Sequence, residues 1–268
     1  MTKIYYFSGT GNSFWTAKKI MQSICEINHS DKCRLFNIGV EEQNEKILIE
    51  ANTVVLVFPC YAYGMPLAVK RFVKKAVFKT PYVVSLVTFG SNPRGTLGAL
   101  KRILDKKEIH KLFFALIPSV ENYTAMFGSP KPELIKRRLQ LQEETTKDAA
   151  VDIIERNENT VSTFTPFSSM VSGLFSLGVK IFYKHYKLSD KCDGCGICGQ
   201  ICPVSAITMK EKRPVFSSKC EHCQGCVNIC PLRAIQFGRV KFGSPGYCRP
   251  GVQIEDLSGN LHNNQCFN

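Results

Sequence analysis

The sequence predicts an α/β fold, in which helices cover both faces of a mostly parallel sheet. Five short runs rich in Val, Ile, Leu and aromatic residues recur along the first 120 residues. Strands buried on both faces of a parallel sheet have this composition, without polar alternation. Helical patterns separate the runs, and a glycine-rich loop follows the first one. We therefore predict a doubly wound five-stranded parallel sheet whose ligand site lies beyond the carboxyl ends of the strands.

The predicted elements alternate along the chain. Strands are expected at 4–7, 34–38, 53–58, 82–88 and 112–117. Helices are expected at 13–28, 66–78 and 96–107, where apolar residues recur at helical spacing with basic residues between them. A charged pattern at 132–156 predicts a further, solvated helix that closes this domain. We place the domain at residues 1–160.

Composition and charge restrict the class of protein. With 268 residues, 44% hydrophobic and 21% charged, the chain is neither disordered nor fibrous. Its 35 Lys and Arg against 22 Asp and Glu give a charge of +13, without a basic tail that would mark a nucleic-acid arm. The start of the chain has no apolar signal core, so we expect a cytoplasmic, reducing location. Clustered cysteines there more often bind metal than form disulfides, and the odd count of 13 excludes complete pairing within one chain.

The loop after the first predicted strand carries a pattern for anion binding. It consists of Ser8, Gly9, Thr10, Gly11, Asn12 and Ser13. Such a loop can direct backbone N–H groups at a phosphate, while its side chains add donors without charge. It is not the dinucleotide motif G-x-G-x-x-G, because Phe14 takes the third glycine position, and no Gly-Lys-Ser/Thr follows as in a Walker A loop. The alternative is an N-capped helix after a glycine turn.

Thr10-Gly11-Asn12-Ser13 after a first strand resembles the phosphate-binding loop of flavodoxins, which bind FMN noncovalently. The resemblance implies that loops after the third and fourth strands hold the flavin ring. These loops contain Pro59, Cys60, Tyr61, Ala62, Tyr63 and Gly64, and then Phe89, Gly90 and Ser91. Tyr63 falls near the position where flavodoxins place an aromatic ring against the flavin, and Tyr61 is the rival for that role. For both tyrosines the alternative is an exposed loop aromatic.

A duplicated cysteine run is the strongest pattern in the sequence. Cys192, Cys195, Cys198 and Cys202 precede a proline, and 28 residues later Cys220, Cys223, Cys226 and Cys230 do the same. Each run has the C-x2-C-x2-C-x3-C-P spacing of bacterial ferredoxins, in which the fourth cysteine binds the other cluster. The resemblance implies two [4Fe-4S] clusters, one held by Cys192, Cys195, Cys198 and Cys230, and the second by Cys220, Cys223, Cys226 and Cys202.

The spacing has a physical reason. Three thiolates on a tight loop can take three corners of a cubic cluster, and the fourth corner then needs a residue from elsewhere. The alternative is zinc, but zinc ribbons with four cysteine ligands need pairs of cysteines rather than a third at x2 and a fourth before proline. His222 lies inside the second run and is expected to be a bystander. We place a small α+β ferredoxin domain at 189–242 and a tail at 243–268.

The stretch at 161–188 predicts an amphipathic linker helix. Its apolar residues at i, i+3 and i+4 are Phe167, Met170, Val171, Leu174, Phe175, Gly178, Ile181 and Phe182. We expect this helix to pack the two domains together. A membrane-surface helix is the less favoured alternative, because Lys180, Lys184, His185 and Lys187 follow at one end.

The order of the two domains resembles the flavodoxin-ferredoxin fusion proteins, or flavoferredoxins, of anaerobic bacteria. The resemblance implies an electron carrier for anaerobic metabolism that connects FMN with two low-potential clusters, and no substrate-transforming residues stand out. The alternative is a flavin-dependent reductase of quinones or nitro compounds. Ordinary flavodoxins and ferredoxins are acidic, whereas this chain is basic. We therefore expect a redox partner with an acidic docking face, and no nucleic-acid partner.

Overall fold

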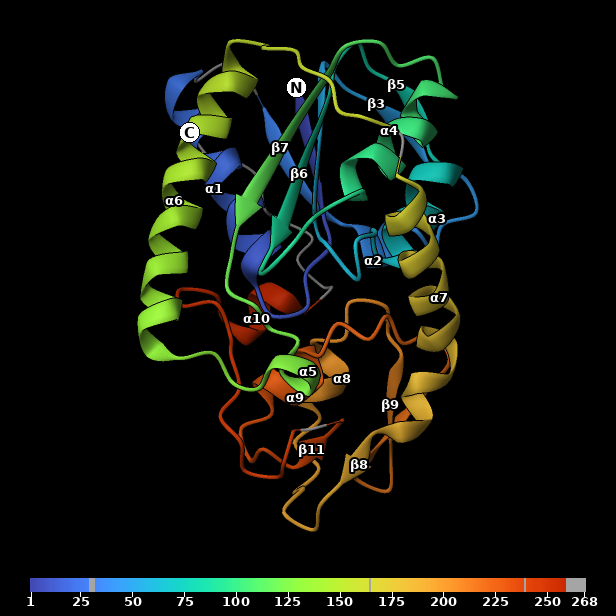
Figure 1. Cartoon of the computed structure of the whole chain (residues 1–268), viewed down its shortest axis with the longest axis vertical. Helices are drawn as coiled ribbons and strands as arrows, with labels where there is room; N and C mark the ends of the chain where they lie inside the picture. Colours follow the sequence, from blue (N-terminus) through green and yellow to red (C-terminus); the bar gives the residue numbers. More distant parts are fainter. Residues whose placement is uncertain (29–31, 164, 239, 259–268) are drawn as a thin grey trace.

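The computed structural model describes residues 1–28, 32–163, 165–238 and 240–258. A parallel sheet with helices on both faces forms the upper part of the molecule in Figure 1. The cysteine-rich part lies below it, at the end of the sheet toward which the strand arrows point. The two parts of the chain therefore meet at the carboxyl ends of the strands, where sheets of this class bind their ligands.

The sheet has the predicted five strands, all parallel. They are β1 (Thr2–Tyr6), β2 (Cys33–Asn37), β4 (Thr53–Pro59), β6 (Val83–Phe89) and β7 (Leu112–Pro118). Their spatial order is β2-β1-β4-β6-β7, so the direction of winding reverses between β1 and β4. This is the flavodoxin-like doubly wound order, and its ligand site lies at that switch point. The fold class predicted from the sequence is confirmed.

Both faces of the sheet are covered by helices, which explains the continuous apolar strands. On one face, α1 (Asn12–Ile27) and α6 (Pro132–Ile154) pack on the side of Ile4 and Val55. On the other, α3 (Leu67–Lys75) and α4 (Thr96–Asp105) pack on the side of Tyr5 and Leu56. Alternate residues of each strand thus enter two separate apolar layers, as a parallel sheet requires.

Some short elements were not predicted from the sequence. Strands β3 (Leu48–Glu50) and β5 (Val77–Lys79) pair with each other in a small separate parallel sheet. The helix expected over 66–78 ends at Lys75 because the chain continues directly into β5. Two single-turn helices, α2 (Ile38–Glu41) and α5 (Thr124–Phe127), follow β2 and β7.

The cysteine-rich part is built of short strands and helices, as expected for a small α+β domain. Its elements are η1 (Tyr183–His185), β8 (Lys187–Leu188), α8 (Ile197–Gln200), β9 (Ile207–Lys210), β10 (Arg213–Phe216), α9 (Gly225–Ile229) and β11 (Ile235–Gln236). In the tail, α10 (Ile254–Leu257) packs on the side of the sheet that α1 covers. Strands β9 and β10 form an antiparallel hairpin, and β8 pairs with β11. Helices α8 and α9 occupy corresponding positions in the two cysteine runs, so the sequence repeat is also a structural repeat.

The linker forms α7 (Pro166–Phe182), but its orientation differs from the expectation. Phe175 and Phe182 do reach the cysteine-rich part, where both rings contact His222. Four other residues of the face point into solvent, with exposed fractions of 62% for Phe167, 57% for Met170, 64% for Leu174 and 54% for Ile181. The neighbouring Leu177 is 66% exposed. The prediction that this face packs the two domains together is therefore wrong for four of its eight residues. Within the described part of the chain, no helix is long and apolar enough to cross a membrane.

Candidate functional site

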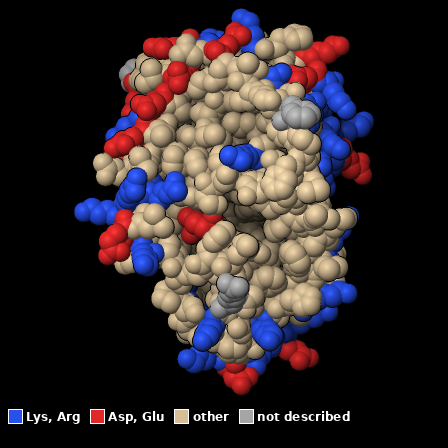
Figure 2. Space-filling model, viewed as in Figure 1, with Lys and Arg blue, Asp and Glu red and all other residues tan. Residues whose placement is uncertain are grey.

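A pocket lies at the carboxyl ends of the parallel strands, where the fold predicts a ligand site. Loops after β1, β4, β6 and β7 line it with Ser8, Gly9, Thr10, Asn12, Ser13, Pro59, Cys60, Tyr61, Thr88, Phe89, Gly90, Ser119, Val120, Glu121 and Asn122. Figure 2 shows that this face of the molecule is hollowed near its middle, below the sheet. Four loops that are distant in the sequence thus converge on one site.

The loop at residues 8–13, called the phosphate seat below, has hydrogen-bond donors suited to a phosphate group. Gly11, at φ +97°, adopts a left-handed conformation that glycine tolerates and directs the chain into α1. The Ser8 hydroxyl accepts a hydrogen bond from the Gly11 N–H at 3.1 Å, and the Ser13 hydroxyl lies 2.7 Å from that of Thr88. No acidic residue occupies the first turn of α1. Uncharged donors at the N-terminus of a 16-residue helix therefore fit a phosphate group.

The loop after β4 makes a tight turn that separates its two tyrosines. Tyr61 and Gly64 exchange backbone hydrogen bonds at 2.8 and 2.9 Å, and Ala62 and Tyr63 take positive φ values between them. Tyr61 lines the pocket, whereas Tyr63 points outward to the Phe167 ring of α7, with ring centroids 6.2 Å apart. The Tyr61 hydroxyl is buried without a hydrogen-bond partner in the described part of the chain. An unpaired buried hydroxyl suits a ligand atom in this pocket.

The predicted flavin-site residues are thus placed in two sets. Ser8, Gly9, Thr10, Asn12, Ser13, Pro59, Cys60, Tyr61, Phe89 and Gly90 line the pocket. Gly11, Ala62, Tyr63, Gly64 and Ser91 do not. Burial raises the pKa of the Cys60 thiol, which accepts a hydrogen bond from the Thr96 hydroxyl at 3.1 Å. Cys60 is therefore protonated at neutral pH. Outside the two cysteine runs, Cys60 and Cys248 are free thiols, whereas Cys25 is disulfide-bonded.

Sequence analysis did not identify some of the residues at this site. The tail turns back over the phosphate seat: the Tyr247 hydroxyl donates to Asn12 Oδ1 at 2.8 Å, and the Arg249 backbone N–H donates to the Thr10 carbonyl at 2.8 Å. Thr88 ends a predicted strand, so the rule that ligands bind beyond carboxyl strand ends could have found it. Tyr247 and Arg249 belong to no motif, and only their position in the fold reveals their contacts.

The structure gathers the eight cysteines into the two expected groups. Cys192, Cys195 and Cys198 of the first run surround one small pocket together with Cys230 of the second run. Cys202, from the first run, lies instead with the second: burial raises the pKa of Cys223, and the neighbouring Cys202 and Cys220 raise it further. The fourth cysteine of each run therefore lies with the first three cysteines of the other run, as in bacterial ferredoxins.

Backbone donors point at several of these sulfurs. Cys202 Sγ accepts from the Ala206 N–H at 3.2 Å, Cys220 Sγ from the His222 N–H at 3.4 Å, and Cys230 Sγ from the Ala234 N–H at 3.4 Å. Such donors stabilise the negative charge of cluster-bound thiolates and tune cluster potentials. Among the described residues, no group of three or more Cys, His, Asp or Glu side chains has the geometry to hold a single metal ion.

His222 contacts aromatic side chains from both parts of the chain. Its two ring nitrogens lie 3.0 Å from the Tyr123 and Tyr186 hydroxyls, and its ring packs on Phe237 with centroids 4.3 Å apart. Burial lowers its pKa to about 4, so the imidazole is neutral at pH 7. The residue joins the cysteine-rich part to the loop after β7.

The second cysteine group adjoins the pocket directly. A Cβ built on Gly9 would lie 2.8 Å from the Cβ of Cys223, and one built on Gly225 would lie 2.6 Å from the Gly9 carbonyl oxygen. Burial raises the pKa of Tyr61 well above its usual value, and the nearby Cys223 adds to this effect. Glu221 and Arg71 form an ion pair at 3.0 Å between the two parts. The phosphate seat and a predicted cluster loop are therefore in van der Waals contact.

Known proteins resemble the two parts separately. Residues 191–234 match the family model of the 4Fe-4S dicluster domain. The chain thus carries a domain of the kind that holds two [4Fe-4S] clusters, which supports iron rather than zinc at the cysteine groups. This match covers only the cysteine-rich part. None of the curated proteins matches the chain.

Solved structures resemble the sheet-containing part. An azoreductase from Bacillus anthracis str. Sterne aligns at 12% identity and a TM-score of 0.41, over 58% of this chain and all of its own length. An FMN-dependent NADH-azoreductase from Bacillus anthracis in complex with FMN aligns at 13% and 0.39, over 57% of this chain and 99% of its own. The flavodoxin of Streptococcus pneumonia TIGR4 aligns at 13% and 0.33, over 55% and 98%. At these values the likenesses carry no functional argument, and the strand order alone defines the fold.

Proposed function

We propose that this chain is an electron-transfer protein that connects one FMN with two [4Fe-4S] clusters and acts as a redox adaptor. Bound FMN would exchange one or two electrons, whereas each cluster exchanges one electron at a time. The observation that carries the proposal is the contact between Gly9, in the phosphate seat, and Cys223, in the second cysteine run. The pocket and the second cysteine group are therefore in direct contact.

The residues of the pocket divide the binding of FMN between them. The hydroxyls of Ser8, Thr10 and Ser13, with the N-terminus of α1, would hold the phosphate. Tyr61 would place its ring against the flavin and direct its unpaired hydroxyl into the pocket. The Tyr247 side chain would fix Asn12 through the 2.8 Å hydrogen bond described above. Burial of the loop would exclude water from the phosphate contacts.

The cysteine groups stand in a definite order relative to this pocket. The group of Cys202, Cys220, Cys223 and Cys226 is the inner one. Cys226 is buried, and Cys198 of the other group is near enough to contribute to the elevation of its pKa by burial. The outer group includes Cys195, which is exposed. Electrons would therefore pass between the surface and the pocket through the outer group and then the inner group.

A basic surface surrounds the outer end of this path. Residues 184–213 contain six Lys and Arg against three Asp and Glu. Figure 2 shows Lys and Arg side chains gathered at the end of the molecule formed by the cysteine-rich part. We infer that the redox partner docks there with an acidic face. The transfer rate to that partner should fall as salt concentration rises, and a rate that is indifferent to ionic strength would contradict this docking mode.

Anaerobic reconstitution tests the central proposal. We expect about eight irons and one FMN per chain. After rapid reduction of the clusters, reduction of the flavin should follow at a rate independent of protein concentration, because both groups belong to one molecule. Cys202→Ser should abolish this phase, whereas Cys248→Ser, outside both groups, should not change it. Zinc in place of iron, absence of bound FMN, or a rate proportional to protein concentration would each refute the proposal.

A further inference from the structure

An exposed apolar stripe runs along α7. It consists of Phe167, Met170, Leu174, Leu177 and Ile181, each more than half exposed. Between residues 167 and 181 the stripe spans 14 helical steps, or about 21 Å. The opposite side of the helix carries the buried Ser168 and Val179. The helix thus turns five large apolar residues toward solvent, whereas Phe175 and Phe182 contact the cysteine-rich part. An ordinary surface helix buries such residues.

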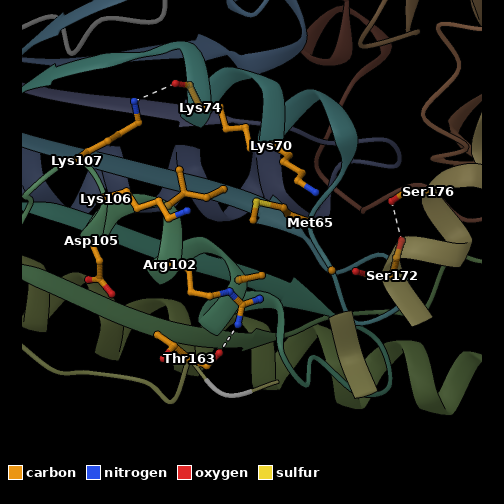
Figure 3. Close-up of a pocket in the computed structure, with 13 residues that line it drawn as sticks. Met65, Lys70, Lys74, Arg102, Asp105, Lys106, Lys107, Thr163, Ser172 and Ser176 are labelled. Carbon is orange, nitrogen blue, oxygen red and sulfur yellow. Dashed lines mark hydrogen bonds between the residues drawn. The ribbon is translucent and has the colours of Figure 1, made fainter. Parts of the chain in front are cut away.

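Basic side chains line a cavity on the side of α7 opposite this stripe. A cavity of about 660 Å³ between α3, α4 and α7 is lined by Lys70, Lys74, Arg102, Lys106 and Lys107. Figure 3 shows these side chains entering the cavity from α3 and from the end of α4, with Ser172 and Ser176 on the neighbouring α7. Asp105 is the acidic residue of the lining, and Lys101 already pairs with it at 2.8 Å. The cavity therefore presents a net positive field on the inner side of α7.

The end of α7 extends the same charge. Lys180, Lys184 and Lys187 are all exposed there. No Asp or Glu occurs in the sequence between Glu158 and Asp190, so the linker has no acidic residue of its own. The combination of an apolar stripe with lysines at its end is typical of helices that lie in the interface of an anionic membrane.

We propose that α7 docks this protein on the surface of an anionic lipid bilayer. The helix lies parallel to the surface, with its five apolar side chains among the acyl chains and the terminal lysines at the level of the lipid phosphates. The stripe is the outer side of a single helix at the edge of the molecule (Figure 1). A fluid bilayer accommodates such a convex stripe without a complementary groove, and its phosphates match the terminal lysines in charge.

Vesicle flotation of the full-length protein tests this proposal. We expect binding to vesicles of phosphatidylcholine mixed with phosphatidylglycerol, weaker binding as salt rises, and no binding to phosphatidylcholine alone. The double variant Leu174→Ser, Leu177→Ser should lower the affinity for mixed vesicles about tenfold or more, since it removes two inserted side chains. The matched control Leu134→Ser, Val151→Ser removes two exposed apolar residues of α6 and should bind as the unmodified protein does.

Charge reversal gives an independent measurement. Lys180→Glu with Lys184→Glu should weaken binding to mixed vesicles by about tenfold or more, since each lysine near an anionic surface contributes to the attraction. Lys131→Glu with Lys136→Glu, at exposed positions in and before α6, should not. All variants change exposed residues, and unchanged melting temperatures would verify their folding. Equal vesicle binding by the α7 and α6 variants would overturn the proposal. So would a dimer that forms without vesicles, is lost in the α7 apolar variant and binds no lipid, because a second copy would then cover the stripe.

Discussion

The contact between Gly9 and Cys223 makes Gly9→Ala a sensitive test of how the two parts of the chain are joined. A methyl group at Gly9 would lie 2.8 Å from both the Cβ and the carbonyl oxygen of Cys223. Carbon atoms in contact prefer about 3.5 to 4.0 Å, so the two segments must separate by about 0.7 Å or more. Neither segment can yield easily, because one is the phosphate seat and the other is a backbone loop between cysteines.

Overpacking of this kind typically costs about 1–3 kcal/mol. For a chain of this size each kcal/mol shifts the melting temperature by roughly 2–4 °C, so we expect a decrease of roughly 2–12 °C. The assay is thermal unfolding of both proteins at equal iron and flavin content, because bound groups add their own stabilisation. Gly173→Ala is the matched control: nothing lies within 4 Å of that position in α7, and alanine favours a helix by up to about 1 kcal/mol. A Gly9→Ala protein that melts at the unmodified temperature would refute the contact.

Four further substitutions test individual residues. Cys202→Ala should remove the EPR signal of the inner cluster and Cys230→Ala that of the outer one, each lowering iron from about eight to about four per chain. Loss of the opposite cluster in either variant would reverse the assignment. Tyr61→Phe should stabilise the flavin-free protein by about 1 kcal/mol in urea unfolding, because its buried hydroxyl has no partner among the described residues. A destabilised protein would show that the hydroxyl is bonded. Tyr247→Phe should cost about 1 kcal/mol, since Asn12 Oδ1 loses its donor. An unchanged urea midpoint would mean that this hydrogen bond contributes nothing.

The sheet could be predicted because its strands are buried on both faces, which leaves uninterrupted apolar runs in the sequence. All five strands lie within two residues of their expected positions. The three-residue strands β3 and β5 gave no such signal, because a run of three residues is too short to show a period. The cysteine groups could be predicted for a different reason. Their spacing repeats, and the geometry of a cubic cluster restricts which sequences can surround it.

The two tyrosines after β4 show the limit of sequence patterns. In an extended strand, Tyr61 and Tyr63 would point to the same side, because side chains alternate with a period of two. The positive φ values at Ala62 and Tyr63 replace the strand by a turn, which separates the two rings. The face of α7 is a similar case. An amphipathic pattern identifies an apolar side, but only the packing of Ser168 and Val179 against the protein shows that this side faces outward.

The covered phosphate seat has a consequence for assembly. Cys223 and Gly225 close the loop at 8–13 from below, and the segment with Tyr247 and Arg249 closes it from the side. A flavin could not enter this seat easily once both covers are in place. FMN would therefore load first, onto a sheet that is already folded, and insertion of the inner cluster would then seal it in. Holoprotein matured in this order would lose its flavin only after its iron, so that iron starvation in the cell would empty both sites in sequence.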